Sequence, residues 1–315
     1  NVEDWHGIDR FPAIPFDGGS DKGFEIKGLK APLFITTEAQ IKNVKLTDVN
    51  IYSKDRFILG AIACSLISAG KGEPASLTNC EVSVAITMDN EIALNEKYDS
   101  AYGVVAMGGL VGLTKGVMVT NCINHANATI LDISSSDNHT ALCPTIAGIV
   151  GYASNGLAAD GTTVTYTCID NCENKGAVKY EDCAEFRHRP FVGGVVGISP
   201  SGNSAGGAFT NCKNYGAISF NGTAYGQAGQ SGTAGIAGVA AGLWTSNISD
   251  CENRGTVTAS GTAHHLSIGG VVGYTTGTHH KNLHNYGMIE VTKEARIIGV
   301  LAGGVGALMY GNADS

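Results

Sequence analysis

Residues 210–219 read TNCKNYGAIS, and the same order of Asn, Cys, Asn and Gly returns around other cysteines. Residues 170–179 read DNCENKGAVK, and residues 249–258 read SDCENRGTVT. A cysteine at a fixed place in a repeated phrase is more typical of a scaffold than of a nucleophile or a metal ligand. We call this pattern the asparagine–cysteine phrase. Its cysteines are Cys80, Cys122, Cys172, Cys212 and Cys251, and KNLHNYG (281–287) carries Leu283 at the same place.

A glycine-rich phrase alternates with the first one. The cysteine positions, with Leu283 as the last, recur every 32–50 residues. A sequence period of this size with inserts of variable length is typical of a solenoid or a propeller. Propeller blades carry four strands and usually a tryptophan motif, whereas this chain has 2 tryptophans. The glycine phrase reads GGLVG at 108–112, AGIVG at 147–151, GGVVG at 193–197 and 269–273, and AGIAG at 234–238, with degenerate forms at 60–64 and 299–303.

We therefore predict an all-β fold, a right-handed parallel β-helix (a solenoid) of about seven coils. In the last repeat, residues 268–274, 281–287 and 288–292 are expected to form the three strands of one coil. Neighbouring coils would lie ~4.8 Å apart, which is the strand spacing of a sheet. The predicted organisation is an N-terminal segment at residues 1–38 that caps the open edge of the first coil, followed by the β-helix repeats at residues 39–315.

Equivalent residues of successive coils would stack on one another in such a fold. Cysteine behaves as a small hydrophobe, and its replacement by Leu283 indicates an inward position. The next asparagine is expected at a corner, with left-handed backbone and its carboxamide bonded to those above and below. The glycine that follows is expected to need a positive φ. The predicted ladder comprises Asn124, Asn174, Asn214, Asn253 and Asn285, followed by Gly176, Gly216, Gly255 and Gly287.

Stacked cysteines would have Cα atoms within disulfide range, but their parallel Cβ vectors suit the bond dihedral poorly. We therefore predict buried free thiols. Cys168 is expected to face inward on its own strand, rather than to form a zinc site with Cys172.

Residues between the ladder positions are predicted to face outward. Glu173, Lys213 and Glu252 alternate in charge directly after the cysteine, so stacked coils could pair them for a few tenths of a kcal/mol each. The position three after the cysteine forms an aromatic and basic row that either holds a ligand such as a glycan or is a solvated sheet face. The candidate ligand-binding residues are Lys175, Tyr215, Arg254 and Tyr286 in this row, with Arg187 and His188 in the polar cluster CAEFRHRP (183–190), a recognition loop or a solvated excursion.

The composition narrows the class of protein. The chain has 315 residues, a formal charge of −8, 43% hydrophobic and 15% charged residues, and 44 glycines. Few charges with abundant glycine predict short strands and tight turns, and the acidic balance argues against a nucleic-acid partner. The longest apolar run, residues 297–311, is shorter than the ~20 residues that a membrane-spanning helix needs. No signal peptide is recognised at the start of the sequence.

The alternation of GGLVG with the asparagine–cysteine phrase resembles the GLUG-type repeats of bacterial surface proteins, especially from Bacteroidetes. The stretches FPAIPFDGGSDKGFEIKGLKAPLF (11–34) and AQIKNVKLTDVNIYS (39–53) look like the N-terminal part of those proteins. The resemblance runs from Phe11 to Gly306 and implies a surface β-helix. Some such proteins are named putative immunoglobulin A1 protease because the repeats accompany a peptidase. This chain lacks the His-Glu-x-x-His metallopeptidase motif, and its long inserts after Cys122 and Cys172 depart from the short regular repeat.

No catalytic residue, metal site or cofactor is predicted. A β-helix glycosidase or lyase would gather carboxylates on one exposed face, whereas the aspartates here are scattered, and the different registers of Asp170 and Asp250 place these two on different faces. The histidine pairs either bind a transition metal or lie in solvated loops. The aspartates considered are Asp132, Asp137, Asp160, Asp170 and Asp250, and the histidines are His264, His265, His279, His280 and His284.

The favoured hypothesis is a non-enzymatic, adhesin-like module that is secreted or on the cell surface and binds a host protein or a glycan. Its contacts would come from exposed sheet faces and from the inserts at 131–146, 154–167, 180–191 and 221–233. The alternatives are a carbohydrate-active β-helix enzyme and the non-catalytic repeat region of a larger surface peptidase. We expect an extracellular or outer-membrane-anchored location, a signal segment outside this sequence, no membrane span, and a chain that is monomeric or part of a longer one.

Overall fold

The computed structural model describes residues 5–19, 24–68, 73–92, 105–135, 143–158, 160–181, 189–200, 208–224, 234–263, 266–276, 279–292, 296–297 and 300–310. These residues form an all-β structure and contain no helix. Four large sheets, here called A to D, contain all of the strands except β18 (Gly156–Leu157) and β19 (Val164–Thr165), which pair antiparallel. The strands of the four large sheets run parallel to one another.

The strands of each sheet come from every repeat of the chain. Sheet A contains β1 (Ile8–Phe11), β4 (Phe34–Thr37), β8 (Ala63–Ile67), β12 (Val111–Lys115), β17 (Val150–Ser154), β24 (Val196–Ser199), β29 (Ala240–Trp244), β34 (Val272–Thr276) and β40 (Gly306–Tyr310). Sheet B contains β2 (Phe16–Asp17), β5 (Gln40–Lys42), β9 (Ser76–Thr78), β13 (Met118–Thr120), β20 (Cys168–Asp170), β25 (Ala208–Thr210), β30 (Asn247–Ser249) and β35 (His280–Lys281).

Sheet C is the largest and sheet D the smallest. Sheet C contains β3 (Phe24–Lys27), β6 (Val44–Ser53), β10 (Glu81–Ile92), β14 (Ile123–Asn124), β15 (Asn127–Ser135), β21 (Glu173–Asn174), β22 (Val178–Tyr180), β26 (Lys213–Asn214), β27 (Ile218–Ala224), β31 (Glu252–Asn253), β32 (Val257–Ala263), β36 (His284–Asn285), β37 (Ile289–Val291) and β38 (Arg296–Ile297). Sheet D contains β7 (Ile58–Gly60), β11 (Ala106–Gly108), β16 (Thr145–Ala147), β23 (Phe191–Gly193), β28 (Ala234–Ala237), β33 (Leu266–Gly269) and β39 (Val300–Gly303).

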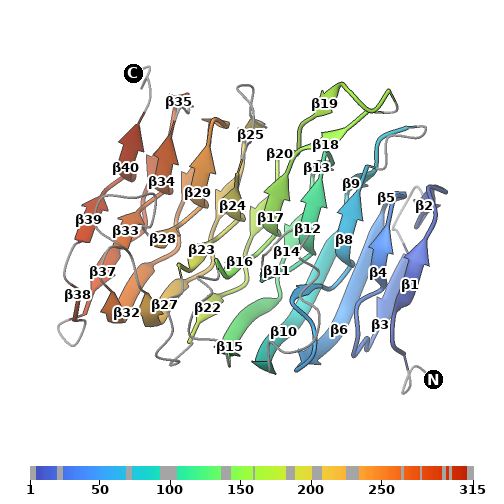
Figure 1. Ribbon diagram of the computed structural model, residues 1–315, viewed down its shortest axis with the longest axis horizontal. Helices are drawn as coiled ribbons and strands as arrows, with labels where there is room; N and C mark the ends of the chain where they lie inside the picture. The colour runs from blue at the N-terminus through green and yellow to red at the C-terminus, as the bar shows by residue number, and fades with distance from the viewer. Residues whose placement is uncertain are drawn as a thin grey trace.

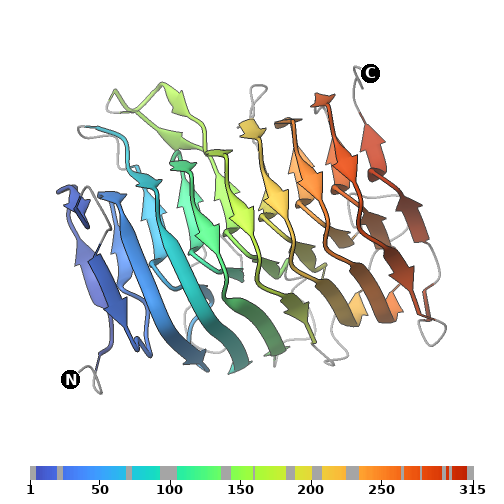
Figure 2. The same cartoon turned by 180° about the vertical axis from the view of Figure 1, so that it is seen from behind.

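Along the chain, the strands visit sheets D, A, B and C in turn, as β11, β12, β13 and β14 do. Each strand then pairs in register with the equivalent strand of the next repeat. Val111 of β12 is opposite Val150 of β17, which is opposite Val196 of β24. Strands of successive repeats therefore lie side by side along the long axis, with the two termini at opposite ends (Figures 1 and 2).

The glycine phrase is a corner between two sheets, and the prediction of one strand over residues 268–274 is wrong. β33 ends at Gly269 in sheet D, and β34 begins at Val272 in sheet A. A Cβ at Gly269 would approach the Val272 carbonyl oxygen to less than 3.0 Å, so the turn in this repeat leaves no room for a side chain, although the equivalent residue is alanine at Ala147 and Ala237. Each repeat therefore has four strand positions instead of three.

The strand register also shows that two copies of the glycine phrase have other bounds than predicted. Ala237 is opposite Gly193 and Gly269, so the phrase in this repeat is AGVAA at 237–241 rather than AGIAG at 234–238. At the C-terminal end, beyond the last repeat that carries the asparagine–cysteine phrase, Gly303 is opposite Gly269, which places the glycine phrase at 303–307 rather than 299–303.

The left-handed corner of the asparagine–cysteine phrase lies one residue before the cysteine, between sheets B and C. The predicted positions, the asparagine two residues after the cysteine and the glycine that follows it, do not have positive φ. Asparagine and aspartate tolerate left-handed backbone because their short side chains form local hydrogen bonds. The residues with positive φ in this corner are Asn43, Asn79, Asn121, Asn171, Asn211, Asp250 and Asn282.

The glycine of the asparagine–cysteine phrase is required by close approach instead of by its φ. A Cβ at Gly216 would lie less than 3.0 Å from the carbonyl oxygen of Gly176 in the preceding repeat. The same is true of Gly255 against Gly216 and of Gly287 against Gly255. Neighbouring repeats therefore contact backbone to backbone at this position, which leaves no room for a side chain.

Residues 1–38, predicted to be the N-terminal segment that caps the first coil, contribute strands to the same sheets as the repeats. Ile8 of β1 is opposite Phe34 of β4, and Phe34 is opposite Ala63 of β8. β2 pairs with β5 in sheet B, and β3 pairs with β6 in sheet C. The strand pairing is therefore continuous across residue 38.

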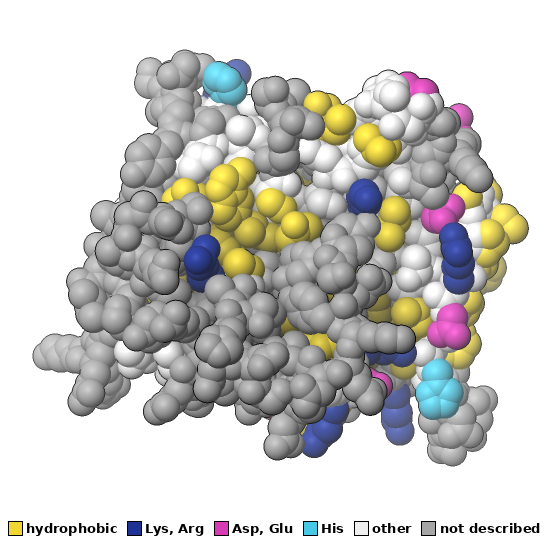
Figure 3. Space-filling view, viewed as in Figure 1, with side chains coloured by type: hydrophobic (Ala, Val, Ile, Leu, Met, Phe, Trp, Pro, Cys, Tyr) yellow, Lys and Arg dark blue, Asp and Glu magenta, His cyan; other side chains and the backbone are white. Residues whose placement is uncertain are grey.

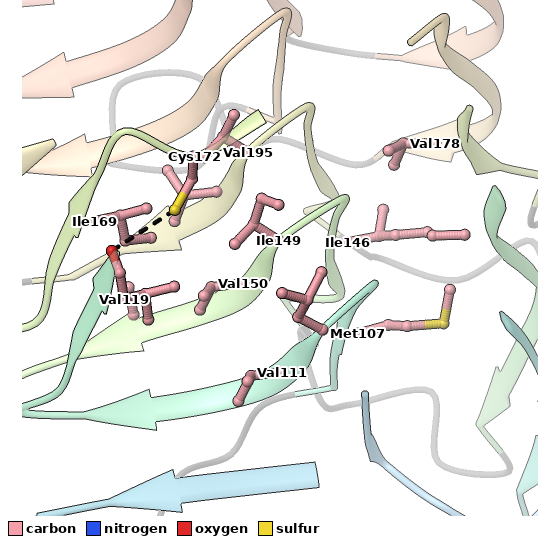
Figure 4. Packing of buried hydrophobic residues seen from close by; sticks show 14 of the residues in the cluster. Met107, Val111, Val119, Ile146, Ile149, Val150, Ile169, Cys172, Val178 and Val195 are labelled. Atoms are coloured by element: carbon pink, nitrogen blue, oxygen red, sulfur yellow. Dashed lines mark hydrogen bonds between the residues drawn. The ribbon is translucent and has the colours of Figure 1, made fainter. Parts of the chain in front are cut away.

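A single apolar core lies between the sheets and extends from Leu29 to Val272 among its fully buried members. Figure 4 shows Cys172 within it, beside Ile169 and Val195. The Cys172 thiol lies 3.6 Å from the Val119 carbonyl oxygen of the preceding repeat. Slim side chains suit this interior because facing sheets must both fill it at close-packed density.

Candidate functional site

The asparagines two residues after the cysteine form a buried ladder in sheet C. The Nδ2 atom of Asn124 donates to Oδ1 of Asn174 at 2.8 Å, and Asn174 donates to Asn214 at 2.7 Å. Asn214 then donates to Asn253, and Asn253 to Asn285, each at 2.8 Å. The second N–H of each carboxamide bonds to a backbone oxygen two residues on, such as Gly216 for Asn214. The four asparagines from Asn124 to Asn253 are fully buried, so these bonds satisfy groups that cannot reach water.

The ladder and the glycine phrase fit together across the core. A Cβ at Gly194 would lie less than 3.0 Å from the carboxamide of Asn214, and Gly238 has the same relation to Asn253. The repeat that has Ala61 instead of this glycine has Val82 instead of the asparagine. Each phrase therefore requires the other, because the carboxamide occupies the volume that an alanine methyl group would need.

A second ladder, which the sequence analysis missed, lies at the exposed left-handed corner one residue before the cysteine. Asn43 donates to Asp17 at 2.8 Å, Asn79 to Asn43 at 3.2 Å, Asn121 to Asn79 at 3.2 Å and Asn171 to Asn121 at 2.7 Å. Restriction of this position to Asn and Asp was the signal that could have identified it, since both residues tolerate positive φ.

Asp170 and Asp250, placed on different faces by the sequence analysis, have the same structural role. The Oδ1 atom of Asp170 accepts from Asn211 at 3.2 Å, and that of Asp250 accepts from Asn282 at 2.7 Å. The hydrogen bond from Asn282 lowers the pKa of Asp250, so that this carboxylate stays ionised. Both carboxylates therefore accept a hydrogen bond from the corner asparagine of the following repeat, Asp170 from its place at the end of β20 and Asp250 from the corner itself.

Asp160 stabilises a local turn. Its carboxylate accepts hydrogen bonds from the Thr163 hydroxyl and from the backbone amides of Thr162 and Thr163. These bonds, chiefly the one from the Thr163 side chain, lower the pKa of Asp160 from its ordinary 3.8 to about 2. Asp137 lies outside the described residues.

The five repeated cysteines are free thiols in the core, each at most 1% exposed. Each thiol donates to the carbonyl oxygen two residues earlier, as Cys122 does to Thr120 at 3.3 Å. Burial, with hydrogen bonds to Cys172 and Cys80, raises the pKa of Cys122 well above its ordinary value. The hydrogen bond to Cys251, with burial, raises the pKa of Cys212. Cys122 and Cys212 therefore remain protonated thiols, which are poor nucleophiles.

We expect the five core thiols to resist modification in the native protein. With an aromatic disulfide reagent at pH 8, Cys80, Cys122, Cys172, Cys212 and Cys251 should react only after denaturation, when all 9 cysteines of the chain become titratable. Mass spectrometry of the labelled peptides identifies which thiols react. The C168S variant is the control, because it removes a half-buried thiol without altering the core row. Rapid native labelling of Cys172 or Cys212 would contradict the burial.

Cys168 faces away from the core, contrary to prediction. It is opposite Met118, which is 56% exposed, while Ile169 next to it is buried. His280 also differs from the predicted solvated loop, because it lies in β35 opposite Ile248 and is buried. Burial lowers the pKa of His280 and keeps its ring neutral. His264 and His265 lie outside the described residues.

The predicted ligand-binding row follows the outer face of sheet C. Lys175, Tyr215, Arg254 and Tyr286 are all exposed, and the backbone amide of each bonds to the preceding repeat at the equivalent position. The guanidinium carbon of Arg254 lies 5.2 Å from the ring centroid of Tyr286. The His284 ring stacks on the same tyrosine with centroids 6.0 Å apart. The Arg254 guanidinium thus contacts the ring face of Tyr286, which is the next residue of the row. This geometry favours cation–π attraction.

Glu173 and Glu252 form ion pairs along the chain rather than with Lys213 between repeats as predicted, whereas Lys45 and Glu81 of the same sheet do pair between repeats at 3.2 Å. Lys175 pairs with Glu173 at 3.0 Å, and Arg254 with Glu252. Residues two apart on a strand face the same side, so these side chains meet without reaching across to the next strand. The hydrogen bond to Glu252 is the main cause of a raised pKa at Arg254. Lys213, in register between Glu173 and Glu252, forms no ion pair with any described residue.

Arg187 and His188 lie outside the described residues, as do parts of the four inserts proposed as contact elements. Within the described ranges, no three His, Cys, Asp or Glu side chains gather closely enough to hold a metal ion. None of the described segments is a helix that could span a bilayer.

An aromatic cluster that the sequence analysis missed lies on the outside of sheets A and D, separate from the core. Phe191 contacts Trp244 edge to face at 5.6 Å, and Trp244 contacts Tyr274 at 5.2 Å. A Cβ at Gly242 would approach the Phe191 ring to less than 3.0 Å, so the ring lies on bare backbone. Hydrophobic side chains are visible on this side of the molecule in Figure 3. Tyr152 and Ile198 complete the cluster.

Comparison with known proteins gives a distant structural likeness. No family model and no curated protein sequence matches the chain. A solved structure described as a putative immunoglobulin A1 protease from Bacteroides ovatus aligns with a TM-score of 0.42 and 16% identity, over 100% of this chain and 74% of that one. The class that the observations define is an all-β protein built from parallel sheets. The GLUG-type resemblance remains a prediction.

Proposed function

We propose that this protein is a non-enzymatic binding module, secreted or on the cell surface, that holds a glycan against the outer face of sheet C. The observation that carries the proposal is the exposed row of Tyr215, Arg254 and Tyr286, with Arg254 against the Tyr286 ring. Tyrosines present a large, rigid apolar face with a hydroxyl at its edge. Sugars match such a surface because their C–H faces stack on rings while their hydroxyls bond to flanking charges.

We propose that the four sheets are the sides of a right-handed parallel β-helix in which the chain turns once through sheets D, A, B and C per coil. Its support is the regular pairing of each strand with the strand one repeat later. A rod of this kind presents the same outward position in every coil, about 4.8 Å apart. An extended ligand can therefore make a repeated contact along one face.

Lys213 supports a ligand that carries negative charge. It lies on β26, two residues before the exposed Tyr215, and no described residue forms an ion pair with it. Lys175 and Arg254 are already neutralised by Glu173 and Glu252. Lys213 is thus a cation of this face that is available to an acidic group on a sugar or a host protein.

A glycan array with the purified protein tests the proposal. We expect binding to a defined set of glycans, and the Tyr286→Ala variant should weaken it by about tenfold, as is typical for truncation of an exposed aromatic anchor. Tyr52→Ala is the matched control, because Tyr52 is 50% exposed on β6 of the same sheet but outside the row. Absence of glycan binding, or equal loss in both variants, would refute the proposal.

A further inference from the structure

At the C-terminal end of sheet C, inward-facing positions are partly exposed, although they are buried in every other repeat with the asparagine–cysteine phrase. In the penultimate repeat, Cys251, Asn253 and Val257 are fully buried. Their counterparts in the last repeat are half-exposed, although they point toward the core in the same register. We call this surface the end face. It comprises Leu283, Asn285, Ile289, Gly304 and Val305.

Asn285 is the last asparagine of the buried ladder, and one of its side-chain N–H groups is an available donor at the end face. A carboxamide nitrogen has two N–H groups. In Asn253 one bonds to the Gly255 oxygen and the other to Asn285. In Asn285 one bonds to the Gly287 oxygen at 2.9 Å, and the other has no acceptor among the described residues.

Gly304 supplies a second, independent feature of the same place. It is the equivalent of Gly270, since Gly303 is in register with Gly269. A Cβ at Gly270 would meet the Asn285 carboxamide, as Cβ atoms at the earlier equivalents would meet the ladder asparagines of their own repeats. A Cβ at Gly304 meets nothing within 4 Å, and this glycine is exposed. The surface beside Gly304 thus has the shape that receives a carboxamide in the other repeats.

We propose that the end face binds an extended segment of another polypeptide, which adds as a parallel strand beside β36 and β37 and carries the phrase apolar–x–Asn–x–Gly. The apolar residue packs on Leu283. The asparagine places its Oδ1 on the free N–H of Asn285 and its carboxamide beside Gly304. Strand addition of this kind draws affinity from main-chain hydrogen bonds and specificity from alternate side chains.

The glycine of the incoming phrase follows from the spacing of the repeats. At each earlier step, a Cβ at the new glycine would lie less than 3.0 Å from the carbonyl oxygen of the glycine or alanine before it, as for Gly287 against Gly255. The strand that follows Gly287 meets the same carbonyl geometry. A segment with glycine at this position fits against that carbonyl, whereas a bulky side chain such as valine would prevent pairing.

A labelled peptide tests the proposal with the protein intact. The probe is a fluorescein peptide of residues 250–263 with C251L, which carries the phrase as Leu, Asn253 and Gly255. We expect saturable binding by fluorescence anisotropy and a higher melting temperature of the protein in its presence. Peptides with Asn253→Leu or Gly255→Val should bind at least about tenfold more weakly, since each leaves a buried polar group unpaired or prevents approach.

Protein variants locate the contact. Gly304→Val should weaken binding of the parent peptide by at least about tenfold, because its side chain fills the carboxamide position. Glu290→Gln, on the exposed side of the same edge, should leave binding unchanged. If Gly304→Val does not fold, the peptide series on the unaltered protein decides. No binding of the parent peptide, equal binding of all the peptides, or undiminished binding to a folded Gly304→Val variant would overturn the proposal.

Discussion

Replacement of Gly216 by alanine should lower the free energy of unfolding by about 4 kcal/mol or more, the range of severe core disruption. The new methyl group would lie less than 3.0 Å from the Gly176 carbonyl oxygen and carbon and from Nδ2 of Asn174. Two of these atoms are backbone between β21 and β22, which both pair with strands of the preceding and the following repeat, so relief requires two whole repeats to separate. The interior is too closely packed to absorb that movement.

Urea denaturation followed by circular dichroism measures the change. Gly304→Ala is the matched control, because its methyl group meets nothing within 4 Å and neither glycine has a positive φ. We expect the control to stay within about 0.5 kcal/mol of the parent protein. A Gly216→Ala variant as stable as the Gly304→Ala variant would show that the repeats are not held at this spacing.

The periodic phrases were sufficient to predict an all-β chain of stacked parallel strands, because a fixed place in a repeat becomes a fixed place on a sheet. Leu283 in place of a cysteine was sufficient to predict that this position faces inward. The physical reasons for the repeated order of residues within the asparagine–cysteine phrase could not be derived from the sequence in the same way. Gly216 is required by the Gly176 carbonyl of the preceding repeat, a contact that depends on the distance between strands and on no local pattern.

The choice between the two asparagines that flank the cysteine was decided wrongly, although the sequence contains the distinction. The position before the cysteine accepts Asp250 as well as asparagine, whereas the position two after it accepts Val82 but no acid. A position that accepts both Asn and Asp is typical of an exposed left-handed corner. A position that accepts valine is typical of a buried site. The ion pair of Lys175 with Glu173 could not be separated from a pair between repeats, because both alternatives place opposite charges within reach.

Replacement of Asn214 by leucine should cost about 3 kcal/mol, even though leucine is close to asparagine in size and more hydrophobic. The variant removes the acceptor of Asn174 and the donor to the Gly216 oxygen and to Asn253, all buried. An unsatisfied buried polar group costs about 1–3 kcal/mol, and the leucine methyl groups would also press on Gly194.

Asn285→Leu provides the comparison that separates the ladder from a single corner. Asn285 accepts one ladder bond but donates none among the described residues, and it is half-exposed, so water can replace what the substitution removes. We expect a loss of about 1 kcal/mol there. Denaturation midpoints of both variants give the ratio. Equal losses would mean that each carboxamide serves only its own turn. A loss at Asn214 two or more times larger would mean that the stacked carboxamides stabilise one another through the buried hydrogen bonds that link the repeats.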